Sequence, residues 1–134
     1  MLEDETKKVE HALSRVVSDL VTSGVSPHEA RISDAPGQVT ARARRGGSNE
    51  ETGVYVHYGK HQVLVDRKLS SEELTVRIAQ FVQDDVIREL HSAWPITPGR
   101  NAPLDARIDS KTGLASWMDE KRAIDIIGEL DASA

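Results

Sequence analysis

The sequence contains no cysteine, and this absence excludes disulfide bonds and zinc sites built from thiolates. Aromatic side chains make up only 4% of the 134 residues, so aliphatic side chains must fill most of the core. No apolar run approaches the roughly 18 residues that a membrane-spanning helix needs. The charged N-terminal segment is also not followed by the apolar stretch of a signal peptide. We expect a soluble, cytoplasmic protein without a membrane segment.

The sequence also lacks an excess of positive charge. Its formal net charge is −5 with 29% charged residues, which disfavours a general nucleic-acid binder. The hydrophobic content of 38% suits one compact domain over residues 1–134. A second domain would have too few apolar side chains for a core of its own.

Residues 3–23 predict an amphipathic helix. Its apolar residues recur at three- and four-residue steps and are Val9, Ala12, Leu13, Val16, Val17, Leu20 and Val21. Gly24 suits the C-terminal cap, and Pro27 ends the helical pattern. We favour a helix that covers a sheet, with a dimerisation helix as the alternative.

A β-hairpin over residues 54–65 is the central pattern of the chain. The Gly-Lys pair at 59–60 fits a two-residue turn, which sets the register of the two strands. One face then carries the valines Val54, Val56, Val63 and Val65. The other face carries Tyr55 opposite Leu64, beside His57. We expect the valine face to be buried and the other face to meet solvent or a partner.

Two further strands are predicted before this hairpin, at residues 28–34 and 38–44. In the second, Arg42 and Arg44 alternate with small apolar residues and share the outer face. The best polar patch of the sequence comprises Arg31, Arg42, Arg44, Arg45 and Lys60. This patch could contact phosphate or an acidic partner. We favour an ordinary charged edge strand, which blocks unwanted pairing.

The hairpin leads into a long helix. Ser70 and Glu73 have the spacing of a capping box. The apolar stripe of the helix is Leu74, Ile78, Phe81, Val82, Val86 and Leu90. Pro95 disfavours helical geometry at the residue before it, so the helix should end near residue 93.

The last third of the chain predicts two short strands and a helix. The strands cover residues 106–108 and 114–118, with Gly113 in the turn between them. Asp119 is placed to cap the helix, whose buried face would be Ala123, Ile124, Ile127 and Leu130. The whole order predicts an α+β fold: a helix, a three- to four-stranded mainly antiparallel sheet, a long helix, a short hairpin and a C-terminal helix.

Two groups of side chains could be metal ligands, but we favour another interpretation for each. His57 and His61 flank the hairpin turn, yet the register puts them on opposite faces, as surface histidines. The long helix carries Asp84, Asp85, Glu89 and His91 without the Glu-x-x-His spacing of carboxylate metal helices. A solvated helix face is favoured there. Since phosphate-loop and nucleophile-elbow motifs are also missing, we predict no metal, cofactor or catalytic residue, and an enzyme is unsupported.

From Trp94 onward the chain resembles a set of small, uncharacterised actinobacterial proteins. Their signature is W-P-x-C-P, then H-P-L, then G-x-A-x-W-x-C-P. It matches residues 94–98, 102–104 and 113–118, except where Thr97, Ala102 and Asp119 replace its Cys and His. In the relatives those residues suggest a small metal or thiol site. The resemblance therefore implies that this site is absent here.

What the resemblance retains is a scaffold that includes Trp94 and Trp117. We interpret both as packing residues, with an exposed binding anchor as the alternative. The order of elements also resembles the compact fold of type III secretion chaperones and their non-secretion relatives. That likeness concerns topology and implies no function by itself.

Three hypotheses for function follow. The first is a non-catalytic protein that acts through protein binding as a homodimer, in a regulatory, chaperone-like or neutralising role. The second is a small-ligand or enzymatic domain with a pocket near Trp94 and Trp117. The third is weak nucleic-acid contact through residues 42–45. The candidate partner-binding residues are Tyr55, His57, Leu64, Arg42, Arg44, Trp94 and Trp117.

Overall fold

A computed structural model describes residues 2–33, 53–66, 68–96, 102–120 and 122–130. The helices and strands in chain order are α1 (Leu2–Thr22), β1 (Ala30–Ser33), β2 (Gly53–Tyr58), β3 (His61–Asp66), α2 (Ser71–Leu90), β4 (Asp105–Ile108), β5 (Ala115–Asp119) and β6 (Arg122–Ile126). The strand predicted at residues 38–44 lies outside the described residues. The predicted class, α+β with antiparallel pairing, is what the described chain adopts.

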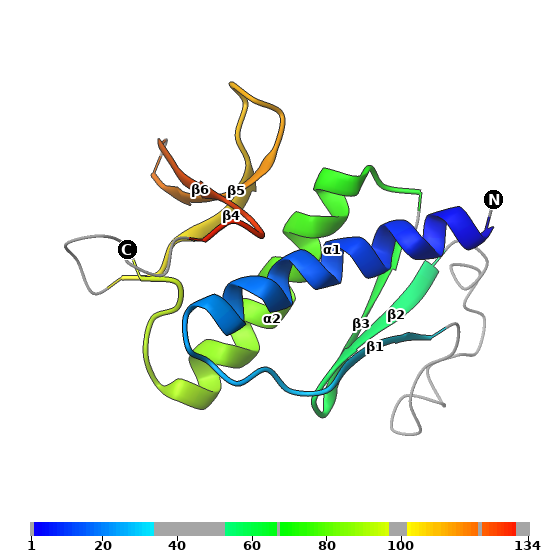
Figure 1. Cartoon of the computed structure of the whole chain (residues 1–134), viewed down its shortest axis with the longest axis horizontal. Coiled ribbons are helices and arrows are strands. Elements are labelled where there is room, and N and C mark those ends of the chain that lie inside the picture. The colour runs from blue at the N-terminus through cyan, green and yellow to red at the C-terminus, as the bar shows by residue number, and fades with distance from the viewer. Residues whose placement is uncertain (1, 34–52, 67, 97–101, 121, 131–134) are drawn as a thin grey trace.

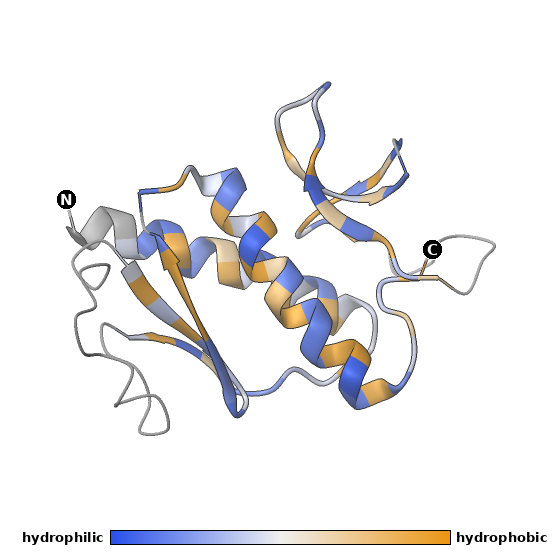
Figure 2. Ribbon diagram, turned by 180° about the vertical axis from the view of Figure 1, so that it is seen from behind, coloured by the Kyte–Doolittle hydropathy of each residue, from blue (hydrophilic) through white to orange (hydrophobic). Residues whose placement is uncertain are grey.

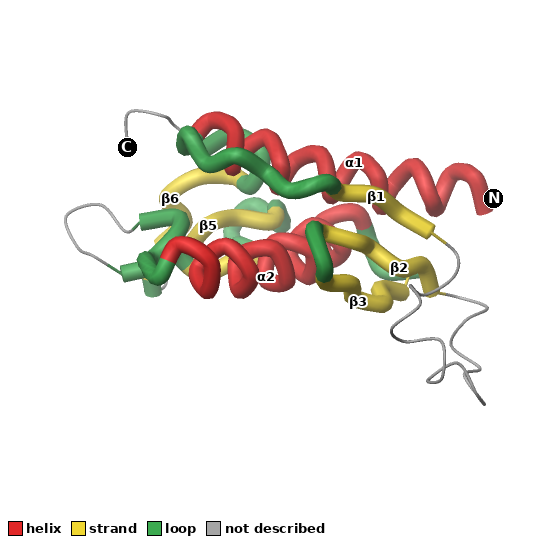
Figure 3. Tube along the Cα trace, turned by 90° about the horizontal axis from the view of Figure 1, so that it is seen from below, coloured by secondary structure: helices red, strands yellow, loops and turns green. Residues whose placement is uncertain are grey.

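The two helices pack side by side and form the centre of the fold. One sheet has the order β1-β2-β3 and the other the order β4-β5-β6. The sheets lie on opposite sides of the helix pair (Figures 1 and 2). Figure 3 shows α1 and α2 running along the length of the molecule. One hydrophobic cluster draws on both helices and both sheets.

The predicted hairpin register is confirmed. Val56 lies opposite Val63 and Tyr55 opposite Leu64 across β2 and β3. Gly59 in the turn has a φ of 59°, a left-handed value that glycine adopts without a steric penalty. The buried face contains Val54, Val56, Tyr58 and Val65. The valine side of the hairpin therefore faces the helices, as the alternation predicts.

The predicted capping box at the start of α2 is confirmed. The Ser70 hydroxyl accepts from the Glu73 N–H, and the Glu73 carboxylate accepts from the Ser70 N–H. The helix ends at Leu90 rather than near residue 93, because His91 takes a left-handed conformation and caps it. Leu90, the last residue of the apolar stripe, is 43% exposed.

The predicted C-terminal helix is wrong. Residues 122–126 form strand β6, which pairs antiparallel with β5. Apolar side chains at 123, 124 and 127 have helical spacing, but three isoleucines within four residues favour an extended strand. The hairpin reverses at Glu120, whose φ is 58°. Pairing with β6 also satisfies backbone groups that β5 would otherwise expose along an edge.

A buried carboxylate fastens the second sheet to α1. Asp19 is fully buried on α1. It accepts hydrogen bonds from the Trp117 indole (2.7 Å), the Gly128 N–H (2.8 Å) and the Leu130 N–H (3.0 Å). Burial raises the pKa of the Asp19 carboxyl, although these donors and the Arg15 guanidinium act in the opposite direction.

A second polar link joins α1, α2 and β5. Arg15 donates to the Ile127 carbonyl (2.9 Å) and pairs with the Glu72 carboxylate (3.1 Å). Glu72 in turn accepts from the Ala115 N–H (2.7 Å). Burial acts to raise the pKa of Glu72, but the Ala115 hydrogen bond and the Arg15 charge outweigh it, so this pKa is lowered. Two side chains of α1, Asp19 and Arg15, therefore fix the position of the last two strands.

We expect Asp19→Asn to lower the free energy of unfolding by about 1–3 kcal/mol at pH 7, measured by urea denaturation. Both carboxylate oxygens of Asp19 accept N–H donors, whereas the asparagine side chain has only one oxygen. Its NH₂ group would face a backbone N–H or the Trp117 indole N–H, and that hydrogen bond would be lost. Asp84→Asn is the matched control on an exposed helix face and should change stability by less than about 0.5 kcal/mol. Equal effects of the two substitutions would contradict a special role for Asp19.

The difference in stability between the wild type and Asp19→Asn should depend on pH in a defined direction. Because the folded-state pKa of Asp19 lies above the ordinary value of 3.8, the folded state holds this proton more tightly than the unfolded chain. The wild type should therefore lose stability relative to Asp19→Asn as the pH rises from 3.8 through the folded pKa. Above that pKa the difference should be constant. A wild type that gains stability relative to Asp19→Asn as the pH rises in this window would contradict the raised pKa of Asp19.

Candidate functional site

The outer face of the β1-β2-β3 sheet carries the predicted partner-binding residues of the hairpin. Tyr55 is half-buried and Leu64 is 36% exposed. The helices pack against the opposite face, where Val54 and Val56 lie. Tyr55 and Leu64 are cross-strand neighbours, so they form one apolar pair on this outer face.

His57 differs from its prediction as a surface histidine, because it is only 7% exposed. Its Nε2 lies 2.7 Å from the Ser33 hydroxyl, and Arg31 is its partner residue across β1 and β2. Burial lowers the pKa of His57, and the Arg31 charge lowers it further. The predicted separation from His61 is confirmed, since His61 pairs with Asp85 on the other face.

We expect the His57 ring to titrate below 6.5, as followed by its imidazole C–H resonances in NMR. Arg31→Ala should raise this pKa partway and leave it below 6.5, because burial is the larger cause. The stability that a neutral His57 contributes is present above pH 6.5 and should be lost as the pH falls from 6.5 through the lowered pKa of the folded state. Titration at or above 6.5 in the wild type would disprove this account.

Trp94 and Trp117 lie in the core, with exposed fractions of 4% and 0%. Their rings meet edge to face at 5.4 Å. Gln83 of α2 donates to the carbonyls of Trp94 (3.1 Å) and Leu104 (2.5 Å), which fixes the segment after α2. Neither Trp can serve as an exposed anchor in this arrangement. The packing interpretation therefore fits their burial.

Two of the open hollows in the described part of the chain have linings that include no Trp. One of about 570 Å³ runs between α1 and β1, with Leu13, Val17 and Ile32 among its lining residues. The other, of about 590 Å³, lies beside the β5–β6 turn and has a charged lining. The pocket near Trp94 and Trp117 stays a prediction from the sequence.

The arginines at residues 42, 44 and 45 lie outside the described residues. Arg42, Arg44 and Arg45 therefore stay candidates from the sequence alone. Arg31, a fourth member of the predicted patch, is exposed on β1. It lies opposite His57 rather than at the hairpin tip, where Lys60 is exposed.

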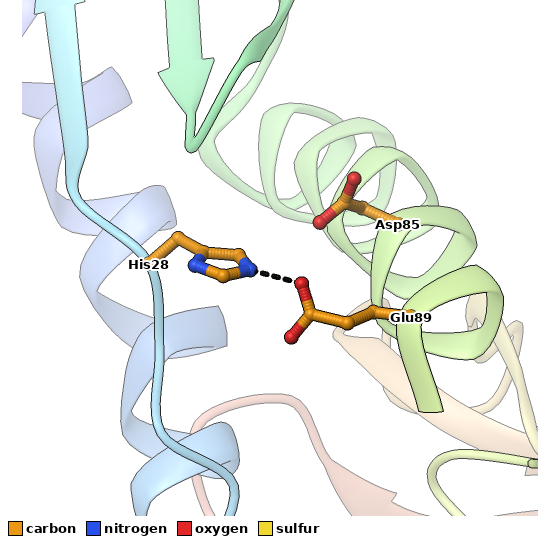
Figure 4. Close-up of side chains that lie close together, drawn as sticks. All are labelled: His28, Asp85 and Glu89. Atoms are coloured by element: carbon orange, nitrogen blue, oxygen red, sulfur yellow. Dashed lines mark hydrogen bonds and ion pairs between the residues drawn. The ribbon is translucent and has the colours of Figure 1, made fainter. Parts of the chain in front are cut away.

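A cluster of possible metal ligands lies where three segments meet; we call it the junction cluster and define it as His28, Asp85 and Glu89. One ligand atom from each residue lies within 4.8 Å of the others. His28 precedes β1, and the two carboxylates lie one turn apart on α2. The imidazole Nε2 of His28 bonds to the Glu89 carboxylate (Figure 4).

The neighbours of the junction cluster hold it in place. The His28 N–H donates to the Tyr58 hydroxyl (3.1 Å), and the two rings meet edge to face at 5.3 Å. Gly59 lies beneath the His28 ring, since a Cβ there would come within 3.3 Å of it. The His61 Nε2 lies 3.2 Å from Asp85. The hairpin turn thus supports His28 from one side and Asp85 from the other.

The sequence pattern singles out Asp85 and Glu89 of this cluster and predicts that they lie on a solvent-exposed helix face. Asp85 and Glu89 share a helix face, but Asp85 is buried rather than solvated. Asp84 and His91, predicted beside them, are exposed and are not members of the cluster. The sequence offers no signal for His28, because it lies 61 residues from Glu89 in an irregular segment.

No protein-family model, curated protein or solved structure matches this chain. Within the last third of the chain, the Leu104 N–H donates to the Pro95 carbonyl (2.8 Å), and the rings of Trp94 and Trp117 meet edge to face. Among the described helices, none combines the length and the apolar character that crossing a membrane requires.

Proposed function

We propose that this protein is a non-catalytic binding protein that acts as a homodimer through the edge of β3 that faces away from β2. The observation that carries the proposal is Leu64, a large apolar side chain exposed on an edge strand. It lies beside Tyr55 on a sheet face that α1 and α2 do not cover. Regulatory, chaperone-like or neutralising roles all use such a surface.

The edge of β3 that faces away from β2 is the surface proposed for strand addition. Within the described residues β3 pairs only with β2. In a two-residue hairpin the closing pair, Tyr58 and His61, exchanges backbone hydrogen bonds, and every second pair does the same. Leu64 lies between such pairs, so its N–H and C=O point away from β2. An added strand would bond to these groups.

The composition of β3 also distinguishes it from the other edges. Edge strands usually avoid pairing by carrying charges, proline or bulges. Charged side chains occur at inner positions of β1 (Arg31), β4 (Arg107) and β6 (Asp125). The four inner residues of β3, from Gln62 to Val65, carry no charge, and its pairing with β2 has no bulge.

A second copy of the chain suits this edge because an antiparallel pair of β3 strands would be two-fold symmetric. A symmetry axis at Leu64 places its N–H and C=O opposite those of the copy. It also brings the two Leu64 side chains together on the outer face. The two three-stranded sheets would then join into one six-stranded sheet.

The test is light scattering at about 10–200 μM protein, across which weak dimers assemble. The wild type should approach twice its chain mass of 14.7 kDa. Leu64→Lys should give a monomer with nearly unchanged stability, because the side chain is already partly exposed. Ile108→Lys is the matched control, since Ile108 is 40% exposed on the edge strand β4.

Two results would overturn the proposal. A wild type that stays at 14.7 kDa throughout this range is not a homodimer. A dimer that Leu64→Lys leaves intact and Ile108→Lys disrupts would use the second sheet instead of β3.

A further inference from the structure

We propose that the junction cluster of His28, Asp85 and Glu89 binds one divalent transition-metal ion of the zinc class. This site is independent of the homodimer, since its side chains lie between α2 and the α1–β1 connection rather than on the outer face of the sheet. The ligands would be the imidazole Nε2 of His28 and one oxygen from each carboxylate.

The spacing of the ligand atoms is close to that of a metal site. Atoms that bind a tetrahedral ion at about 2.0–2.1 Å lie roughly 3.3 Å apart. The three atoms here lie within 4.8 Å, so coordination requires shifts of about an ångström. The side chains of His28 and Glu89 are 40% and 53% exposed and have room to make them. Asp85, with 11% of its side chain exposed, stays in place.

The protein holds the imidazole ready for this role. Tyr58 fixes the backbone of His28 through its hydroxyl, and the turn at Gly59 supports the ring. The Gly59 N–H also donates to the Glu29 carbonyl (2.9 Å), which ties the hairpin turn to the segment that carries His28. Little backbone ordering is therefore left for the metal to impose.

The groups around the cluster are compatible with a cation. Two carboxylates balance the charge of a divalent ion. His61, 3.2 Å from Asp85, can orient that carboxylate, as partners of ligands commonly do. Arg88 also competes for Asp85, but it lies 3.8 Å away and its side chain is 65% exposed, so it can turn away.

The donor set selects the class of ion. One imidazole nitrogen and two carboxylate oxygens suit Zn²⁺, Co²⁺ and Ni²⁺. Ca²⁺ takes six to eight oxygen ligands, and Mg²⁺ requires octahedral oxygen ligands, so neither is well served by this cluster. Three protein ligands leave a fourth position for water or for a donor atom from a bound partner.

The experiment uses the untagged full chain, with Zn²⁺ binding measured by calorimetry and Co²⁺ binding by visible absorption. The wild type should bind one Zn²⁺ per chain, show the ligand-field bands of Co²⁺, and ignore Mg²⁺ and Ca²⁺. His28→Gln and Glu89→Gln should each weaken Zn²⁺ binding by about 100-fold or more, and His61→Gln by about 10-fold. Both ligand positions are partly exposed, so these variants should keep the fold, checked by circular dichroism.

The matched controls are Asp84→Asn, next to Asp85 on α2, and His11→Gln, an exposed histidine of α1. Both should bind Zn²⁺ as the wild type does. The absence of a Zn²⁺ signal in the folded wild type would overturn the proposal and leave a His28–Glu89 ion pair that only joins two segments. A signal that His28→Gln and Glu89→Gln leave unchanged would overturn it too, because the ion would then bind elsewhere.

Discussion

The buried carboxylate of Asp19 is the constraint on which the second half of the fold depends. N–H donors from Trp117, Gly128 and Leu130 offset part of its cost of burial, and the rest raises the pKa of the carboxyl. Each donor belongs to the segment that follows β4, so one side chain of α1 sets where β5 and the end of β6 lie. Arg15, one turn earlier, repeats the arrangement through the Ile127 carbonyl.

The helix α2 packs against both sheets. Its buried residues include the polar Thr75, Gln83 and Asp85 besides an apolar stripe. Each polar member has a partner on another segment: Arg15 for Thr75, two backbone carbonyls for Gln83, and His61 for Asp85. A helix packed on two sides needs such residues because an apolar stripe covers only one side.

The proposed dimer edge and the junction cluster use opposite faces of the same hairpin. Alternation along β2 and β3 sends Tyr55 and Leu64 outward, and Tyr58 and His61 toward the helices. The outer face carries the proposed dimer contact, whereas the inner face at the turn supports His28 and Asp85. A short hairpin can thus serve two purposes because its side chains alternate.

The sequence by itself determined the features that depend on local pattern. The 3.6-residue period located α1 and α2, the Ser70–Glu73 spacing located a helix start, and a two-residue turn set the register of β2 and β3. These follow from steric and hydrogen-bonding rules that act over a few residues. The aliphatic character of most of the core also followed from composition.

Only the tertiary structure decided the rest. Residues 122–126 have spacing compatible with a helix, and pairing with β5 made them a strand. The burial of Asp19 and His57 depends on donors and neighbours far away in the chain. His28 lies beside Asp85 and Glu89, although it is 61 positions from Glu89 in the sequence. Contacts of this kind depend on how elements pack, and a single sequence carries no local signal for them.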